Sequence, residues 1–221
     1  MTITSLPRVV LKSLKERSLQ RMHPWVFSGA IKTLDEGIKE GDLVEVCDNQ
    51  GQHLATGHYQ ASSLAVRLLR FGTGPIDQEF WNERISAALN LRRTLGFWDS
   101  EQTNAWRLVH GEGDGLPGLV IDFYAGLAVV QCHSLGMLHS LEPISEALRR
   151  ALGGRLTGIY NKSETTLPYP VTPAAPSGLL WGQAPDLVIS EHGHRFAIDY
   201  HEGQKTGFFW TNERIGTWSK A

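Results

Sequence analysis

The segment Gly72-Thr73-Gly74-Pro75 divides the chain into two parts of different character. Two glycines and a proline interrupt regular structure, so the segment indicates a linker. Before it lie short strand-like runs, of which Leu43–Cys47 and His53–Tyr59 are expected to pair around the turn residues Asp48–Gly51. After it, apolar residues recur at helical spacing from Asp77 to about Leu95. A small β unit followed by a unit that mixes helices and strands is therefore predicted.

Hydrophobic spacing and turn chemistry predict further elements. A capping box at Ser13–Glu16 predicts a short helix that ends near His23-Pro24. An amphipathic helix is predicted over about Leu138–Leu152. The proline-rich stretch from Pro168 to Pro185 predicts an extended loop. The remaining predicted elements are strands, over Leu64–Phe71, Leu108-Val109, Leu119–Tyr124, Leu127–His133, Leu156–Tyr160, Asp186–Ser190 and His194–Tyr200.

Composition limits the class of protein. The chain has 221 residues, of which 41% are hydrophobic and 20% charged, as in a globular protein of one or two domains. It has no apolar run of the roughly 18–20 residues that a membrane helix requires, and no signal-peptide pattern. Two cysteines, Cys47 and Cys132, argue against a disulfide scaffold, and the histidines lack metal-site spacing. We expect a cytoplasmic protein without metal or membrane partners, with both cysteines in or near the core.

Positive charge gathers near the start of the chain. Residues 1–34 contain six lysines and arginines against one glutamate, although the whole chain has a net charge of −2. Such an arm is a candidate phosphate-contacting surface, and a solvated helix face is the alternative. Arginine can contact phosphate while tryptophan or histidine stacks on an unpaired base, but Val26 and one of Trp25 and Phe27 are expected in the core. The predicted RNA contacts are Lys12, Lys15, Arg17, Arg21, His23 and Trp25.

The segment Glu202–Phe209, with the sequence EGQKTGFF, has the residue types of an anion-binding loop. A phosphate loop of the Walker A type requires a glycine directly before the lysine. Gln204 occupies this position, so a nucleotide hydrolase is excluded.

A second glycine-rich segment, Gly113–Gly118, matches the letters of a dinucleotide-binding fingerprint. That fingerprint requires a helix directly after the glycines, whereas here strand-forming residues follow, so a Rossmann dinucleotide site is not predicted. We expect instead a tight loop in which four side chains converge, and a purely structural loop whose acids cap backbone donors is the alternative. The four cleft-loop residues are Arg107, His110, Glu112 and Asp114.

The chain resembles a known family in several motifs. Arg8–Lys12, His23–Ile31 and Gly41–Val46 look like parts of a PUA domain, a small β-barrel module that binds RNA. Arg107–Leu119 and Gly203–Phe209 look like the middle domain of PUA-containing class I S-adenosylmethionine (SAM)-dependent methyltransferases related to large-subunit rRNA cytosine-C5 methyltransferase I. The resemblance covers nearly the whole chain in the family's order.

This resemblance implies an α+β fold: a small PUA-like β-barrel, then a mixed α/β domain with an antiparallel-rich sheet, and no Rossmann methyltransferase domain within the chain. The implied parts are a PUA-like RNA-binding domain at 1–73, the middle domain at 74–205, and the start of a missing catalytic domain at 206–221. Cysteine attack on the base is expected in the family, but neither cysteine lies in a motif resembling the catalytic one. No catalytic residue is therefore assigned.

The resemblance also implies a function. We expect an RNA-binding and substrate-positioning N-terminal part of an rRNA cytosine-C5 methyltransferase that lacks the catalytic domain, with a stand-alone RNA-binding adaptor as the alternative. A small-molecule enzyme that uses the cleft loop is the weaker third reading. Lys205, Thr206 and Phe208 are expected near the methyl donor. SAM is implied for the full-length family, with little binding to this chain alone, and the implied partners are ribosomal RNA and a possible dimer.

Overall fold

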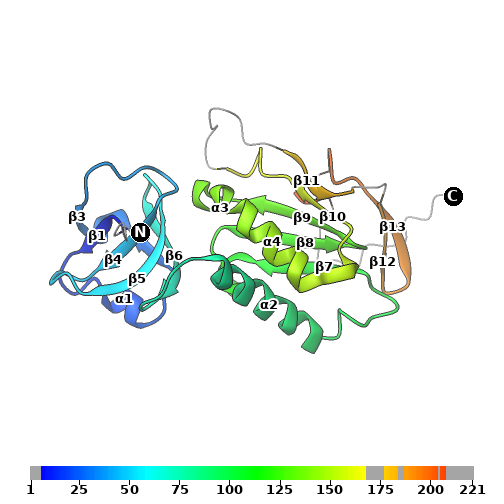
Figure 1. Cartoon of the computed structure of the whole chain (residues 1–221), viewed down its shortest axis with the longest axis horizontal. Helices are drawn as coiled ribbons and strands as arrows, with labels where there is room; N and C mark the ends of the chain where they lie inside the picture. The colour runs from blue at the N-terminus through cyan, green and yellow to red at the C-terminus, as the bar shows by residue number, and fades with distance from the viewer. Residues whose placement is uncertain (1–5, 168–176, 184–186, 204, 208–221) are drawn as a thin grey trace.

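The computed structural model describes residues 6–167, 177–183, 187–203 and 205–207. These residues form two units that lie next to each other along the longest axis of the molecule (Figure 1). The first unit ends with strand β6 (Leu64–Phe71), and the second begins with helix α2 (Gln78–Thr94). The linker predicted at residues 72–75 therefore lies between them.

The first unit is a six-stranded sheet with the order β2-β6-β5-β4-β1-β3. Neighbouring strands are antiparallel except β1 and β4, which are parallel. Alternate residues face inward, so Val9, Leu11, Val44 and Val46 are fully buried in one core. The hairpin predicted for β4 and β5 is confirmed. The remaining strands are β1 (Arg8–Leu11), β2 (Trp25–Phe27), β3 (Ile31–Leu34), β4 (Leu43–Cys47) and β5 (His53–Tyr59).

Helix α1 is shorter than the capping box predicts. It spans only Arg17–Gln20, and its N-cap residue, Glu16, makes no side-chain capping bond. The cause lies one turn earlier, where Leu14 adopts a left-handed backbone with φ 67° and prevents the helix from starting at Ser13. The helix ends in a Schellman motif: the backbone N–H of Met22 bonds to Leu19, and that of His23 bonds to Ser18.

The second unit is built on a five-stranded sheet with the order β11-β10-β9-β8-β7. Helices α2 and α4 (Leu141–Leu152) lie side by side against this sheet, and α3 (Leu135–His139) faces the first unit (Figure 1). Their apolar faces share one core with Ile121, Phe123 and Val130. The strands are β7 (Ala105–His110), β8 (Leu119–Tyr124), β9 (Leu127–Cys132), β10 (Gly158–Asn161) and β11 (Gly178–Gly182).

The α+β class predicted for the whole chain is wrong. Strands β9 and β10 pair in parallel, and α3 and α4 form the crossover between them. A parallel pair needs such a crossover, so helices and strands are interleaved here and the chain is mixed α/β. The parallel pairing has no local sequence signal, because it joins residues about 30 positions apart, whereas the hairpins β7–β8 and β8–β9 pair neighbouring segments.

Two predicted boundaries in this unit need correction. The helix expected over Leu138–Leu152 is two helices, because Pro143 cannot donate a backbone bond to His139 and its ring would clash with that carbonyl. Strand β11 lies inside the stretch expected to be a loop and pairs with β10. The rest of that stretch, residues 168–176 and 184–185, lies outside the described residues.

A two-stranded sheet, β12 (Leu187–Glu191) and β13 (His194–Ile198), covers the other face of the five-stranded sheet. Ile189 and Ile198 pack there against Leu127 and Val129, so the central strands are buried on both sides. Among the described residues, no helix is long and apolar enough to cross a membrane. Within the same residues, no group of three or more His, Cys, Asp or Glu side chains could hold a metal ion.

Candidate nucleic-acid interface

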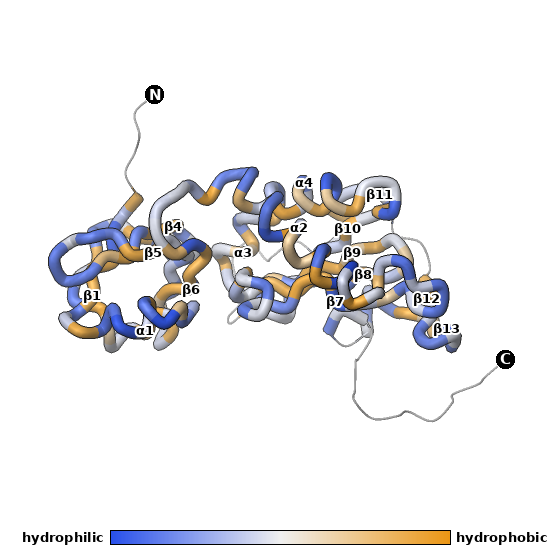
Figure 2. The backbone as a smooth tube through the Cα atoms, turned by 90° about the horizontal axis from the view of Figure 1, so that it is seen from below, coloured by the Kyte–Doolittle hydropathy of each residue, from blue (hydrophilic) through white to orange (hydrophobic). Residues whose placement is uncertain are grey.

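The basic residues predicted to contact RNA lie on one side of the first unit. They flank or belong to α1, which is mostly hydrophilic in Figure 2, and each of them is exposed. The ammonium group of Lys12 donates to the carbonyl of Gly29 at 2.9 Å, which fixes that charge beside the turn after β2. The predicted contacts on this face are Lys12, Lys15, Arg17, Arg21 and His23.

Trp25 connects this basic face to the second unit. Its side chain is half-buried, and its indole Nε1–H donates to Oε1 of Glu112 at 2.9 Å. From the sequence, Trp25 was expected to contact RNA and Glu112 was expected to belong to the cleft loop, so the two residues were placed in separate sites. The fold brings the two together, because β2 lies at the edge of its sheet and faces the 3₁₀ turn η2 (Gly111–Asp114).

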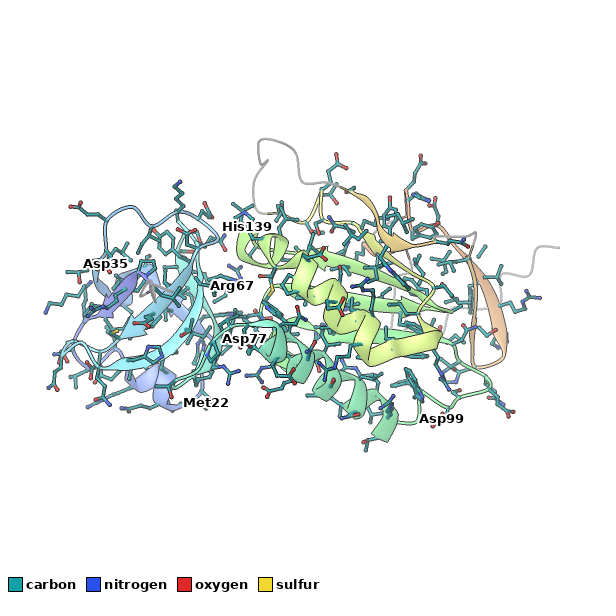
Figure 3. The ribbon with its side chains drawn as sticks, viewed as in Figure 1. Met22, Asp35, Arg67, Asp77, Asp99 and His139 are labelled. Carbon is teal, nitrogen blue, oxygen red and sulfur yellow. The ribbon has the colours of Figure 1, made fainter. Side chains whose placement is uncertain are left out.

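Arg67 is a residue of this junction that the sequence analysis did not single out. It lies opposite Trp25 on β6 and donates to the side chain of Gln60. Burial lowers the pKa of Arg67, and the nearby Glu112 carboxylate opposes that change. Figure 3 shows Arg67 and His139 where the two units meet. The available signal was that Arg67 interrupts the apolar residues at 64–69.

The two backbones approach closely beside Arg67. A Cβ on Gly136 of α3 would lie only 2.1 Å from Cγ of His58, so this helix position tolerates only glycine. His58 is 4% exposed, and its Nδ1 has no hydrogen-bond partner among the described residues. Burial, and then the neighbouring His139 and Arg67, lower the pKa of His58 to about 4, so the ring is neutral at pH 7.

Three of the four cleft-loop residues are linked to one another, because Nη1 of Arg107 lies 3.3 Å from Nδ1 of His110 and the backbone N–H of His110 donates to Asp114. Arg107 forms a two-pronged ion pair with Asp122, at 2.9 and 3.0 Å. Asp114 instead pairs with Arg92 on α2 and accepts the backbone N–H of His110 at 2.6 Å. The alternative of a structural loop therefore describes Asp114. Glu112 differs from it, because its carboxylate points to the first unit.

The clasp, which we define as Asp122, Tyr124 and Thr206, holds the end of the described chain against the sheet. The Thr206 hydroxyl lies 2.6 Å from Oδ2 of Asp122 and 2.7 Å from the Tyr124 hydroxyl. All three residues are buried, and the ion pair with Arg107 balances the Asp122 charge. Burial is also the main cause that raises the pKa of Tyr124.

The clasp changes the expectation for the residues predicted near the methyl donor. Because the Thr206 hydroxyl is already bonded within the chain, this side chain holds the loop in place. Lys205 next to it is exposed and has a left-handed backbone with φ 55°. Phe208 lies outside the described residues. Asp122 and Tyr124 were missed, although an aspartate in the centre of an apolar strand is a signal for a buried partner.

Both cysteines are buried, as predicted. Burial is the largest cause that raises the pKa of each thiol, to about 12 for Cys132. Both thiols therefore stay protonated at pH 7, and neither has the thiolate character that a nucleophile requires.

Several known proteins are similar to this chain in sequence. Residues 9–71 match the family described as PUA-like domain. The chain is 34% identical over 206 residues to Ribosomal RNA large subunit methyltransferase I of Erwinia tasmaniensis, covering 91% of this chain and 51% of the relative. The protein of the same name from Alteromonas mediterranea is 35% identical over 205 residues, again 91% of this chain and 51% of the relative. The chain thus spans about half the length of the curated relatives it matches.

Solved structures share the fold. A proposed SAM-dependent methyltransferase from Streptococcus mutans superposes with a TM-score of 0.75 at 20% identity, over 91% of this chain and 50% of that one. A proposed methyltransferase complexed with SAH gives 0.74 at 18% identity over the same shares. This chain therefore has the fold of these two structures. Its sequence is similar to the large-subunit rRNA methyltransferases, and its first part to the PUA-like domain family, so the resemblance seen in its motifs is confirmed.

These findings overturn two expectations. The chain was expected to contain no Rossmann methyltransferase domain, yet 91% of it superposes on these two proposed methyltransferases. It was also expected to be an RNA-positioning part without the catalytic domain, or a stand-alone adaptor. The same superposition and the similarity to rRNA methyltransferases contradict that function.

Proposed function

We propose that this chain acts in the SAM-dependent methylation of large-subunit ribosomal RNA, as a methyltransferase of the family to which it is related. The observation that carries the proposal is the 34% identity to relatives named for that activity across 91% of the chain. The bond from Trp25 to Glu112 at 2.9 Å supports it, because it joins the PUA-like unit to the unit that carries the clasp.

A deletion strain of the source organism tests this proposal. We expect its large-subunit rRNA to lack one methyl group that the parent carries, and the gene to restore it from a plasmid. The rRNA of the deletion strain is then the natural substrate for the purified protein with labelled SAM. An unchanged methylation pattern in the deletion strain would refute the proposed function.

We further propose that the basic face contacts the RNA backbone. Replacing Lys12, Lys15, Arg17 and Arg21 together with glutamine removes up to four phosphate contacts. For single-stranded RNA this should lower the slope of log affinity against log salt by about 3. The matched control removes the same charge from exposed residues of the second unit, Arg93, Arg150, Arg155 and Arg195. Equal salt slopes for the two variants would show that the basic face does not contact the RNA backbone.

The cofactor proposal concerns the residues at the clasp. SAM supplies the methyl group in this class, and we propose that Lys205 contacts it while Thr206 only positions the loop. Lys205 is an exposed residue, and its positive charge suits the carboxylate of the donor. In a calorimetric titration with SAH, Lys205→Met should weaken binding and Thr206→Ser should preserve it, because serine keeps the hydroxyl. Equal affinities for Lys205→Met and the parent protein would exclude this contact.

We also propose the domain division 1–73 and 74–205. Each part has a hydrophobic core of its own, around Val44 in the first and Ile121 in the second. Most of the predicted third part, 206–221, lies outside the described residues. A dimer stays a prediction.

A further inference from the structure

The return loop, which we define as residues 199–203 and 205–207, folds back on itself after β13. The carbonyl oxygen of Asp199 accepts the backbone N–H of Gly203 at 3.0 Å, and the Asp199 carboxylate accepts two more N–H groups of the loop at 2.9 Å each. A Cβ on Gly203 would lie 2.2 Å from that carbonyl oxygen, and one on Gly207 would lie 2.7 Å from it. Both positions therefore require glycine, and the two ends of the loop meet at Asp199.

Lys162 joins the return loop to the end of β10. Its Nζ donates to the carbonyl oxygen of Gly203 at 2.6 Å, across 41 positions of the sequence. Hydrogen bonds from an ionised donor are short and roughly twice as strong as neutral ones. Burial lowers the pKa of Lys162, and the Asp199 carboxylate opposes that change. The half-buried ammonium thus exchanges part of its hydration for a bond to the loop.

The backbone on either side of Lys162 is itself fixed. The N–H of Lys162 donates to the carbonyl of Val130 in β9 at 2.8 Å. Ser163 is fully buried, and its hydroxyl donates to the side chain of Asn161 and accepts the backbone N–H of Cys132 at 2.9 Å. Buried polar groups that satisfy one another make a structure rigid. The ammonium therefore reaches the return loop from a rigid base on β10, whereas the clasp holds the loop from β8.

Lys205 lies in the chain between the two points that are held. Gly203 is bonded to Lys162, and Thr206 is bonded to the other members of the clasp. The left-handed φ of 55° at Lys205 is a conformation that persists only where the surrounding structure imposes it. A side chain whose backbone is fixed before binding loses less freedom when it meets a ligand.

We propose that Lys162 is a positioning residue, which fixes the return loop so that Lys205 meets the carboxylate of the methyl donor. The inference rests on the proposed cofactor contact of Lys205 and names the residue on which that contact depends. The sequence alone gave no reason to connect the two lysines, because 43 positions separate them.

Calorimetric titration with SAH in a double-variant cycle tests this role. Lys162→Met removes the ammonium and should weaken binding about tenfold, because the loop must then become ordered on binding. Lys162→Met combined with Lys205→Met should bind within about twofold of Lys205→Met alone, because Lys162 acts through Lys205. A merely structural role would weaken binding in both backgrounds. Lys39→Met is the control, since it removes the same charge from an exposed residue of the first unit and should bind as the parent protein does.

Hydrogen exchange measures the order of the loop without the cofactor. In Lys162→Met the amides of the return loop should exchange about threefold faster or more, because one of its anchors is lost. The amides of β4 in the first unit should keep the parent rates, which shows that the fold is intact. Lys162→Arg should restore both the slow exchange and the affinity, because a guanidinium can also donate to the carbonyl of Gly203.

The outcomes separate this inference from the proposed function. Losses that multiply in the double variant, parent-like exchange in Lys162→Met, or equal losses in Lys162→Arg and Lys162→Met would each overturn the positioning role. It would also be overturned if the parent protein did not bind SAH, or if Lys205→Met bound it unchanged, because Lys205 would then have no contact to be positioned for. Methylation of rRNA in the deletion strain is measured without these variants, so the proposed function stands or falls separately.

Discussion

At the scale of the residue, a buried ion pair stabilises the fold only while both of its charged partners are present. Asp122 is fully buried, and its main counter-charge is Arg107, whose side chain is 30% exposed. Asp122→Asn leaves the guanidinium without that counter-charge, so we expect the free energy of unfolding to fall by about 2–4 kcal/mol, less than for a fully buried pair. Urea unfolding measures it. Asp99→Asn is the control, since its pair with Arg155 is exposed and should matter by less than about 0.5 kcal/mol. An equal loss of unfolding free energy in the two variants would show that the buried ion pair of Asp122 stabilises the protein no more than the exposed one of Asp99.

His58 gives a pH dependence with a definite sign. Its pKa is about 4 in the folded protein and about 6.5 when unfolded, because it is buried beside His139 and Arg67. Between these values the unfolded chain binds the extra proton, so stability falls as the pH falls. Protonation of His58 in the unfolded chain should lower the free energy of unfolding by about 2 kcal/mol between pH 7 and pH 5. Urea unfolding of His58→Gln should lack that part of the slope, while His133 contributes equally to both proteins. Parallel profiles would contradict the prediction.

At the scale of the element, α1 shows strain that a substitution can relieve. Met22 occupies the position after the C-cap, where glycine is the usual residue, with φ 60°. We expect Met22→Gly to stabilise the protein by about 0.5–1 kcal/mol, since glycine relieves more strain than it adds unfolded-state entropy. Gln20→Gly inside the same helix should destabilise it by a similar amount. Thermal unfolding distinguishes the two signs, and a destabilised Met22→Gly would show that the methionine side chain is needed.

Elements were predicted well where the signal is local. The hairpin β4–β5, the strand β8 and the helix α2 follow from turn residues, alternation and helical spacing. The break at Pro143 was readable from proline chemistry but was outweighed by the amphipathic stripe around it. The parallel pairing of β9 with β10 was not readable, because it depends on packing of α4 across the sheet.

At the scale of the whole molecule, the residues of the candidate site that have a local sequence signal were predicted, and the contacts between distant residues were not. Exposed basic residues near α1 could be found from charge alone. The bond between Trp25 and Glu112 joins residues 87 positions apart, and the one between Thr206 and Asp122 joins residues 84 apart. No local sequence pattern indicates contacts between residues so far apart in the chain, because these contacts depend on how the two units dock and how the chain returns to the sheet. The sequence indicated these contacts only indirectly, through charged residues among apolar ones in a strand, Arg67 in β6 and Asp122 in β8.

Docking of the two units depends on a glycine. The β-carbon of Gly136→Ala would lie 2.1 Å from Cγ of His58, close to the backbone of β5, where the ring cannot swing away freely. We therefore expect α3 to move off the first unit at a cost of about 1–3 kcal/mol, while both cores stay folded. Limited proteolysis should then cleave the linker at residues 72–75 faster, and small-angle scattering should show a larger radius of gyration. Gly154→Ala, with open space around its Cβ, should behave like the parent protein. If the linker of Gly136→Ala is as protected as that of the control, the units are held together by contacts other than the approach of α3 to β5.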